Sequence, residues 1–186
     1  MRTGTDVETA LLGPVLPDRD CGNCTACCTV LTVDTPDLKK PAGTPCVHLC
    51  ANGCGIHDIR PKICRTWFCA WRRVASMPDA ARPDRSGLIV SLNFVQQPQN
   101  CFEAVSINVR VLEGSDAIAN GMAAAVLDSL CNQLVPVWFS DGSRKMLMHP
   151  ENDVADLVIS GGRAPAHLED EVGAWRDRYG MFATDG

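Results

Sequence analysis

The spacing of apolar residues predicts strands and a hairpin in the second half of the chain. Residues 88–95 (LIVSLNFV) are apolar almost without interruption, which is typical of a buried strand. Residues 104–112 (AVSINVRVL) alternate apolar and polar side chains and predict a half-exposed strand. Two further apolar runs, 135–140 and 144–149, flank Asp141-Gly142, a pair that suits a type I′ hairpin turn. The apolar face of the second strand consists of Val105, Ile107, Val109 and Val111.

Apolar residues at helical spacing predict three helices around these strands. Residues 115–134 are rich in Ala, Leu and Met, and Ser115 is a suitable N-cap. Residues 150–159 and 166–179 predict two more helices, which Gly161-Gly162 separates. Strands and helices in this order indicate an α+β fold with a small antiparallel sheet. The first helix carries its apolar face at Ile118, Met122, Ala125, Val126 and Leu130.

The first half of the chain lacks such patterns and divides into three segments. Residues 1–20 mix apolar side chains with Gly and Pro and predict a flexible or loosely packed N-terminal arm. Residues 21–73 are rich in Cys, Pro and Gly, which indicates a loop-rich lobe held together by metal. Residues 74–87 (VASMPDAARPDRSG) are typical of a linker. Residues 88–186 then form the α+β scaffold.

The chain of 186 residues contains eleven cysteines, most of them in the loop-rich segment. No stretch approaches the ~20 apolar residues of a membrane helix, and the first residues lack the apolar core of a secretory signal. We therefore expect a cytoplasmic protein that meets no membrane. Disulfides do not persist in that compartment, so clustered cysteines there indicate a metal site. The clustered cysteines are Cys21, Cys24, Cys27, Cys28, Cys46, Cys50, Cys54, Cys64 and Cys69.

The first cysteine block has the spacing CxxCxxCC. Two residues between cysteines let the chain turn back, so that two sulfurs reach one metal. Zinc sites use this spacing, and so do iron–sulfur clusters, whose bacterial ferredoxin pattern begins with CxxCxxC. The side chains of the adjacent Cys27 and Cys28 diverge, so they serve either two sites or two iron atoms of one cluster. The spacing therefore leaves zinc and iron–sulfur, and one or two centres, as alternatives.

The later cysteine blocks have features that suit a metal site. Gly53 and Gly55 bracket Cys54 and allow a tight turn with close approach of the backbone. Pro61 suits the first turn of a helix. On that helix Cys64 would share a face with three aromatic residues, which either cover the metal site or pack in the core. These aromatic residues are Trp67, Phe68 and Trp71.

The charge of the chain is uneven. The net charge is −5, yet residues 21–73 carry seven basic and three acidic side chains and are cationic. Arginine and lysine next to thiolates offset the negative charge of a metal–thiolate centre. We expect Arg60 and Arg65 to support the site through hydrogen bonds to thiolates, carbonyls or carboxylates. A nucleic-acid surface is the weaker alternative, because the basic residues are few and the chain as a whole is acidic.

Two separated blocks together resemble the zinc- or iron-chelating cysteine-cluster proteins of the YkgJ type. The first block is CxxCxxCC at residues 21–28, and the second runs from Pro45-Cys46 through Gly53-Cys54 to the RPKICR segment at residues 60–65. The resemblance covers residues 21–71 and implies metal chelation without a defined activity. Seven cysteines belong to the motif, while Cys50 and Cys69 lie outside it. His57 stands where this family usually has Tyr, so it is either a nitrogen ligand or a packing residue; His48 is a weaker candidate ligand.

Three functions fit these observations. The first is an iron–sulfur protein with a redox or accessory role, and its potential would be set by hydrogen bonds and burial of the cluster. The second is a structural zinc module that acts as a scaffold for a protein partner. The third is a metal-delivery protein with an exchangeable site. No phosphate-binding loop, nucleophile elbow or paired carboxylates can be recognised, so the sequence leaves open whether the protein is an enzyme.

Overall fold

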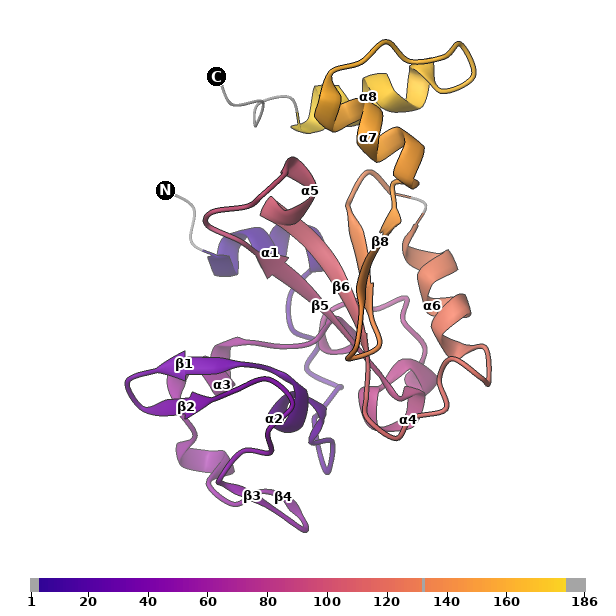
Figure 1. Cartoon of the computed structure of the whole chain (residues 1–186). Helices are drawn as coiled ribbons and strands as arrows, with labels where there is room; N and C mark the ends of the chain where they lie inside the picture. Colours follow the sequence, from indigo (N-terminus) through magenta and orange to yellow (C-terminus); the bar gives the residue numbers. More distant parts are fainter. Residues whose placement is uncertain (1–3, 132, 180–186) are drawn as a thin grey trace.

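The computed structural model describes residues 4–131 and 133–179. Over these residues the chain forms one four-stranded sheet, two small two-stranded sheets and short helices around them (Figure 1). This confirms the α+β class. None of the helices in the described ranges is both long enough and apolar enough to cross a membrane.

The four-stranded sheet is mixed, whereas we expected an antiparallel one. Its order is β5-β6-β7-β8; the β5/β6 and β7/β8 pairs are antiparallel, but β6 and β7 are parallel. Parallel neighbours require a long crossover, and here the segment that contains α6 (Met122–Leu130) connects them. The strands span Leu88–Phe94 (β5), Val105–Val111 (β6), Val137–Ser140 (β7) and Lys145–His149 (β8).

One face of this sheet carries the main hydrophobic core. The alternation along β6 is confirmed, since Val109 is fully buried and pairs with Val90 of β5 on the same face. Helix α6 covers this face with Ala123 and Val126. The neighbouring residue Ile89 points to the opposite face and is also buried. Both faces of β5 are therefore covered, which explains its uninterrupted apolar sequence.

Helix α6 begins later than the apolar pattern predicts. Gly121, in the left-handed region with φ of +80°, precedes its first residue, and the Asn120 side chain accepts a hydrogen bond from Met122 N at 2.9 Å. Ser115 caps a turn instead of a helix, because its Oγ accepts a hydrogen bond from Ala117 N at 3.0 Å. The chain before Gly121 is consequently non-helical, and Ala117 fills the core as a buried turn residue.

The β7–β8 hairpin is present, but the type I′ turn is wrong. That turn requires positive φ at both central residues, and among the described residues only glycines have positive φ. Gly142 has φ of +91°, whereas Asp141 does not enter this region. Asp141 Oδ1 instead accepts hydrogen bonds from the backbone N of Ser143 at 3.0 Å and of Arg144 at 2.9 Å. The aspartate side chain thus closes the turn.

A second core joins the C-terminal helices to the end of the sheet. Helices α7 (Asn152–Ser160) and α8 (Glu169–Tyr179) pack with α5 (Cys101–Ala104) around the buried Trp175. Arg176 of α8 donates to the carbonyls of Leu157 and Gly162, each at 2.6 Å, and so holds the connection between α7 and α8.

The N-terminal segment and the expected linker are both structured. Helix α1 spans Gly4–Leu12, and the guanidinium of Arg19 donates to the carbonyls of Val74 at 3.0 Å and Met77 at 2.6 Å. The expected linker contains the short helices η3 (Asp79–Ala81) and α4 (Pro83–Ser86), with Ala81 and Ser86 buried. The expected loose arm is therefore held by side-chain hydrogen bonds to backbone carbonyls.

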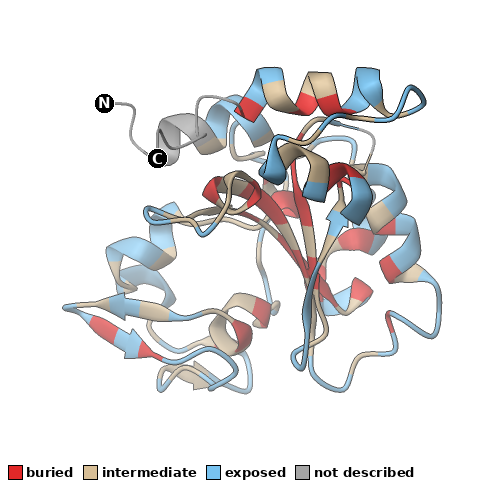
Figure 2. Ribbon diagram, turned by 45° about the horizontal axis from the view of Figure 1, so that its top comes forward, coloured by how far each residue is buried: buried red, intermediate tan, exposed pale blue. Residues whose placement is uncertain are grey.

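Residues 21–69 form a loop-rich cysteine lobe on the face of the sheet opposite α6. Figure 2 shows few buried residues in this lobe compared with the strands of the large sheet. Its small core is Ala26 and Val30, which pack on Ile89, and Arg110 of β6 donates to the Val30 carbonyl at 2.7 Å. The lobe contains α2 (Ala26–Val30), β1 (Val33–Thr35), β2 (Leu38–Lys40), β3 (Leu49–Cys50), β4 (Gly53–Cys54), η1 (His57–Ile59) and α3 (Lys62–Thr66).

Gly87, between α4 and β5, is expected to tolerate no side chain. Its φ is +69°, and a Cβ built there would lie 2.7 Å from Ser115 Cβ, which cannot rotate away. Gly114 is a matched control, because its φ is +74° but nothing lies within 4 Å of a Cβ built on it. We expect Gly114→Ala to cost about 1 kcal/mol from backbone strain alone and Gly87→Ala about 2–4 kcal/mol. Urea unfolding of both variants measures the difference, and equal losses would contradict this account.

Candidate metal centre

All eleven cysteines are free thiols, and the nine within residues 21–69 come from every part of the cysteine lobe. Eight of these nine divide into two neighbouring sets according to which thiols lie near enough to shift one another's pKa, while Cys50 belongs to neither. Set A is Cys21, Cys24, Cys27 and Cys69. Set B is Cys28, Cys46, Cys54 and Cys64.

Set A lies where the lobe meets the large sheet. A turn closed by the Cys24 N to Cys21 O hydrogen bond of 2.9 Å leads into α2, which carries Cys27 on its first turn. Cys69 directly precedes the short helix η2 (Ala70–Arg72). Three of these thiols, Cys24, Cys27 and Cys69, pack against the same small cluster as Ile89. The set therefore draws on segments far apart in the sequence.

Burial is the main cause of the raised pKa of two thiols of set A, Cys24 and Cys69. The pKa of Cys69 is raised to about 11, mainly by burial and also by the nearby Cys21 and Cys24 thiolates, while backbone hydrogen bonds at Arg72 and Trp71 oppose the increase. The pKa of Cys24 is also raised, first by burial and then by the carboxylate of Asp84. The Arg82 side chain donates a hydrogen bond to the Cys21 carbonyl at 2.7 Å and forms an ion pair with Asp84 at 2.9 Å. Burial therefore favours the protonated thiol at Cys24 and Cys69 when no metal is bound.

Set B lies in the outer part of the lobe. Cys46 N donates to the Cys28 carbonyl at 2.9 Å, so the second cysteine block is tied directly to the end of the first. Cys54 lies on β4, where it pairs with Leu49 of β3, three residues after Cys46. Cys64 lies on α3. Burial raises its pKa, and the Cys28, Cys46 and Cys54 thiolates nearby raise it further.

The two sets meet at the adjacent Cys27 and Cys28. A hydrogen bond between their sulfurs raises the pKa of Cys27 and lowers that of Cys28 to about 7. Burial opposes the decrease at Cys28, whereas the positive charges of Lys40 and Arg60 contribute to it. These neighbours thus favour the thiolate of Cys28, and thiolate is the form that binds metal.

Lys40 is a buried cation beside the thiols that sequence reasoning missed. It is 5% exposed, and its Nζ donates to the carbonyls of Thr29 at 3.1 Å, Pro41 at 3.2 Å and Thr44 at 2.8 Å. Burial lowers its pKa, which the Cys46 and Cys28 thiolates oppose. Nothing in the sequence distinguished Lys40 from its neighbour Lys39; strand β2 places Lys39 on the exposed face and Lys40 on the buried one.

Arg60 lies at the edge of set B, whereas Arg65 does not. The Nε of Arg60 donates to the Cys64 carbonyl at 2.9 Å, and its Nη1 donates to the His57 carbonyl at 2.8 Å. Arg65 is on the exposed side of α3 and has no hydrogen-bond or ion-pair partner among the described residues. The His57 ring lies 2.7 Å from Arg60 Nη1, and the His48 carbonyl accepts from Gly55 N at 2.8 Å.

The remaining cysteines lie away from the two sets. Cys50 is exposed, and its sulfur donates to the Gly53 carbonyl at 3.2 Å within its own hairpin. Cys101 begins α5 and packs on the C-terminal core, while Cys131 follows α6 and packs on the main core.

The prediction that aromatic residues share a helix face with Cys64 is wrong. Helix α3 ends at Thr66, and Trp67 is already extended, with φ of −88° and ψ of 132°. The chain then turns, so the aromatic residues separate. Trp67 packs with the thiols of set A, whereas the buried Trp71 lies between the guanidinium groups of Arg19 and Arg82.

The donor set is chemically suited to zinc or an iron–sulfur cluster, since both take cysteine thiolates as ligands and neither set contains a disulfide. Within the part of the chain that the structure describes, no three His, Cys, Asp or Glu side chains converge closely enough to hold a metal ion as they stand. Metal binding would therefore draw the sulfurs of a set closer together. The loops that carry them contain few buried residues to resist this movement.

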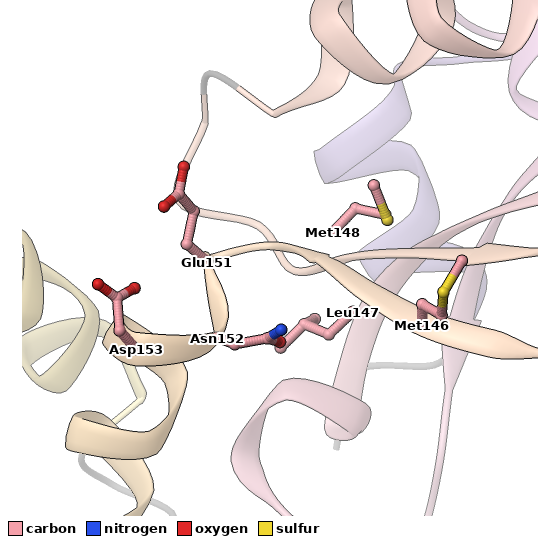
Figure 3. Close-up of a pocket in the computed structure, with 6 residues that line it drawn as sticks. All are labelled: Met146, Leu147, Met148, Glu151, Asn152 and Asp153. Carbon is pink, nitrogen blue, oxygen red and sulfur yellow. The ribbon is translucent and has the colours of Figure 1, made fainter.

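A separate cavity of about 680 Å³ lies between β8 and the start of α7 (Figure 3). It contains no cysteine or histidine, and its methionines come from β8 while its carboxylates come from the segment that enters α7. It has no nucleophile with an adjacent base, which a hydrolytic site would need. Its lining residues are Met146, Leu147, Met148, Glu151, Asn152 and Asp153.

Comparisons with protein-family models, with curated proteins and with solved structures return no match for this chain. The resemblance to the YkgJ-type proteins therefore depends on the two cysteine blocks alone. The case for a metal site depends on the residues described above.

Proposed function

We propose that the cysteine lobe binds a thiophilic metal, either as an iron–sulfur cluster or as zinc, and that this cytoplasmic protein is related to the YkgJ-type chelating proteins. The observation that carries the proposal is that free thiols from five segments of the lobe lie near enough to raise one another's pKa. Cys21 and Cys24 act on Cys27 and Cys69, and Cys28, Cys46 and Cys54 act on Cys64. All of these thiols are free, so disulfide bonds do not explain why they lie close together. The hydrophobic core of the lobe is small, so core packing does not explain it either.

The charges around set B support the same proposal. Four thiolates on a divalent metal leave a net negative centre, which is unfavourable in a partly buried position unless cations are near. Lys40 and Arg60 supply two positive charges there. Lys40 is held by three carbonyls, so its charge stays in place beside Cys28 and Cys46. When bound, the metal would supply either electron transfer or cross-linking of the lobe.

A redox or accessory role follows if the metal is an iron–sulfur cluster, because such a cluster exchanges electrons. A structural zinc module that presents the lobe to a protein partner is the second candidate. It is favoured by the small core of the lobe, in which only Ala26 and Val30 are buried against Ile89. A segment with so little core depends on a cross-link for stability.

The decisive experiment is metal and sulfide analysis of protein purified without oxygen. Matched iron and acid-labile sulfide, with a brown colour, would establish a cluster; colourless protein with stoichiometric zinc would establish the zinc module. Protein that holds neither metal, and takes up neither on reconstitution, would contradict the proposal.

Cysteine variants test which thiols bind the metal. We expect Cys24→Ser and Cys64→Ser each to lower the metal content by half or more and to lower the melting temperature, because metal-binding energy is folding energy in such a lobe. Cys131→Ser is the control, since this cysteine packs on the scaffold core and should leave the metal content unchanged. Full metal content in both lobe variants would exclude these thiols as ligands.

A further inference from the structure

We propose that set A and set B are two separate four-thiolate centres that adjoin at Cys27 and Cys28. This inference rests on the proposed function and assigns each thiol to a centre. It places Cys69, which lies outside the CxxCxxCC and second cysteine blocks, in the first centre and leaves Cys50 in neither.

The course of the backbone separates the two sets. Helix α2 packs Ala26 and Val30 on Ile89 of the large sheet, and Cys27 packs on that same cluster with Cys24 and Cys69. The Cys28 carbonyl instead accepts the hydrogen bond from Cys46 N, 2.9 Å away, so residue 28 joins the loop that leads to β3 and β4. Cys27 therefore belongs with the thiols that pack toward the sheet, whereas Cys28 is tied to the outer lobe, and the two sets adjoin where these neighbouring sulfurs meet.

Cys69 completes set A because the chain turns after α3. The helix that carries Cys64 ends at Thr66, and the extended backbone at Trp67 leads the chain back to the sheet. Trp67 and Cys69 then pack beside Cys24 and Cys27. Only four residues separate Cys64 from Cys69, yet each lies with a different set.

The numbers of donors also favour two centres. Each set holds four thiols, which is the ligand count of a tetrathiolate zinc site and of a cubane iron–sulfur cluster. Cys50 is outside this count, because it is exposed and its sulfur is bonded within its own hairpin. The surroundings differ as well: Lys40 and Arg60 lie beside set B, and the carboxylate of Asp84 lies beside set A.

Cobalt(II) titration of the reduced, metal-free full chain tests the inference, since thiolate-bound cobalt has intense absorption. We expect two equivalents to bind to the wild-type chain. The double variant Cys24→Ser/Cys69→Ser should keep one equivalent in set B, and Cys54→Ser/Cys64→Ser should keep one in set A. Cys50→Ser is the matched control from the same lobe and should keep two.

The outcomes separate the two proposals. One equivalent in the wild-type chain, lost completely in both double variants, would overturn the two-centre assignment while metal binding stands. The assignment of thiols to centres would be overturned if the wild-type chain bound two equivalents but a folded double variant did not keep one. It would also be overturned if Cys50→Ser bound less cobalt than the wild-type chain. No cobalt, zinc or iron bound to the wild-type chain would overturn the proposed function itself. The wild-type stoichiometry decides the number of centres even if a double variant fails to fold.

Discussion

Replacing Trp175 with alanine is expected to lower the free energy of unfolding by about 3–5 kcal/mol. The indole is fully buried at the centre of the second core. Its ring lies 5.6 Å from the Phe102 ring at an interplanar angle of 80°, and 5.5 Å from the Tyr179 ring in a stacked arrangement. These contacts join α5 and α8, so the cavity left by alanine would weaken the attachment of both C-terminal helices to the sheet.

Two controls make this prediction specific to packing. Trp175 Nε1 has no hydrogen-bond partner among the described residues, so Trp175→Phe loses volume but no hydrogen bond and should cost about half as much or less. Ile159→Ala removes a large side chain from a position of α7 that is 53% exposed and should cost below about 1 kcal/mol. Urea unfolding followed by tryptophan fluorescence and circular dichroism measures all three. A loss below about 1 kcal/mol for Trp175→Ala would show that the C-terminal helices contribute little to global stability.

The strands of the large sheet could be predicted because local periodicity determines them. The alternation from Val105 to Val111 indicated one buried face, and the structure has that face against α6. Strand pairing could not be predicted, because a parallel β6/β7 pair depends on the path of a long connection and not on either strand's own residues. The prediction that the helix begins at residue 115 was wrong for a different reason. The side chains of Ser115 and Asn120 form hydrogen bonds with the local backbone and favour turns.

The candidate site was predictable in its membership but not in its arrangement. Spacing led us to expect that the Cys27 and Cys28 side chains diverge, whereas their sulfurs lie side by side, and it could not show that Cys69 lies with Cys24 across the lobe. That grouping depends on where α3 ends and on the packing of Trp67 and Cys69 against the cluster around Ile89, which are tertiary features. Lys40 was missed because a lysine on a short strand is normally solvent-exposed, and its burial becomes evident only when the three carbonyl acceptors are in place.

Replacing Arg73 with methionine is expected to destabilise the protein by about 3–5 kcal/mol and to release α1. The Arg73 side chain is 3% exposed; its Nη2 lies 2.9 Å from Glu8 Oε2, and its Nη1 donates to the Gly13 carbonyl at 3.0 Å. Methionine would leave the Glu8 carboxylate, which is only 15% exposed, without its cation. An unpaired charge in such a position lowers the free energy of unfolding. This loss is larger than the stability that the intact ion pair adds relative to two apolar side chains of similar shape.

A double-mutant cycle separates the buried charge from the loss of packing. Glu8→Gln combined with Arg73→Met removes both charges, so it should be less destabilising than Arg73→Met alone by at least about 1 kcal/mol. Arg85→Ala is the exposed control, because its pair with Asp79 at 3.1 Å has side chains that are 53% and 73% exposed and should contribute below about 1 kcal/mol. Limited proteolysis before residue 20 reports the release of α1 independently. If Arg73→Met neither lowers stability nor exposes this segment to protease, the ion pair does not hold α1 on the protein. The N-terminal segment is then anchored by Arg19, by the hydrogen bond from Leu16 N to the Arg72 carbonyl and by the packing of Leu12 on the main core.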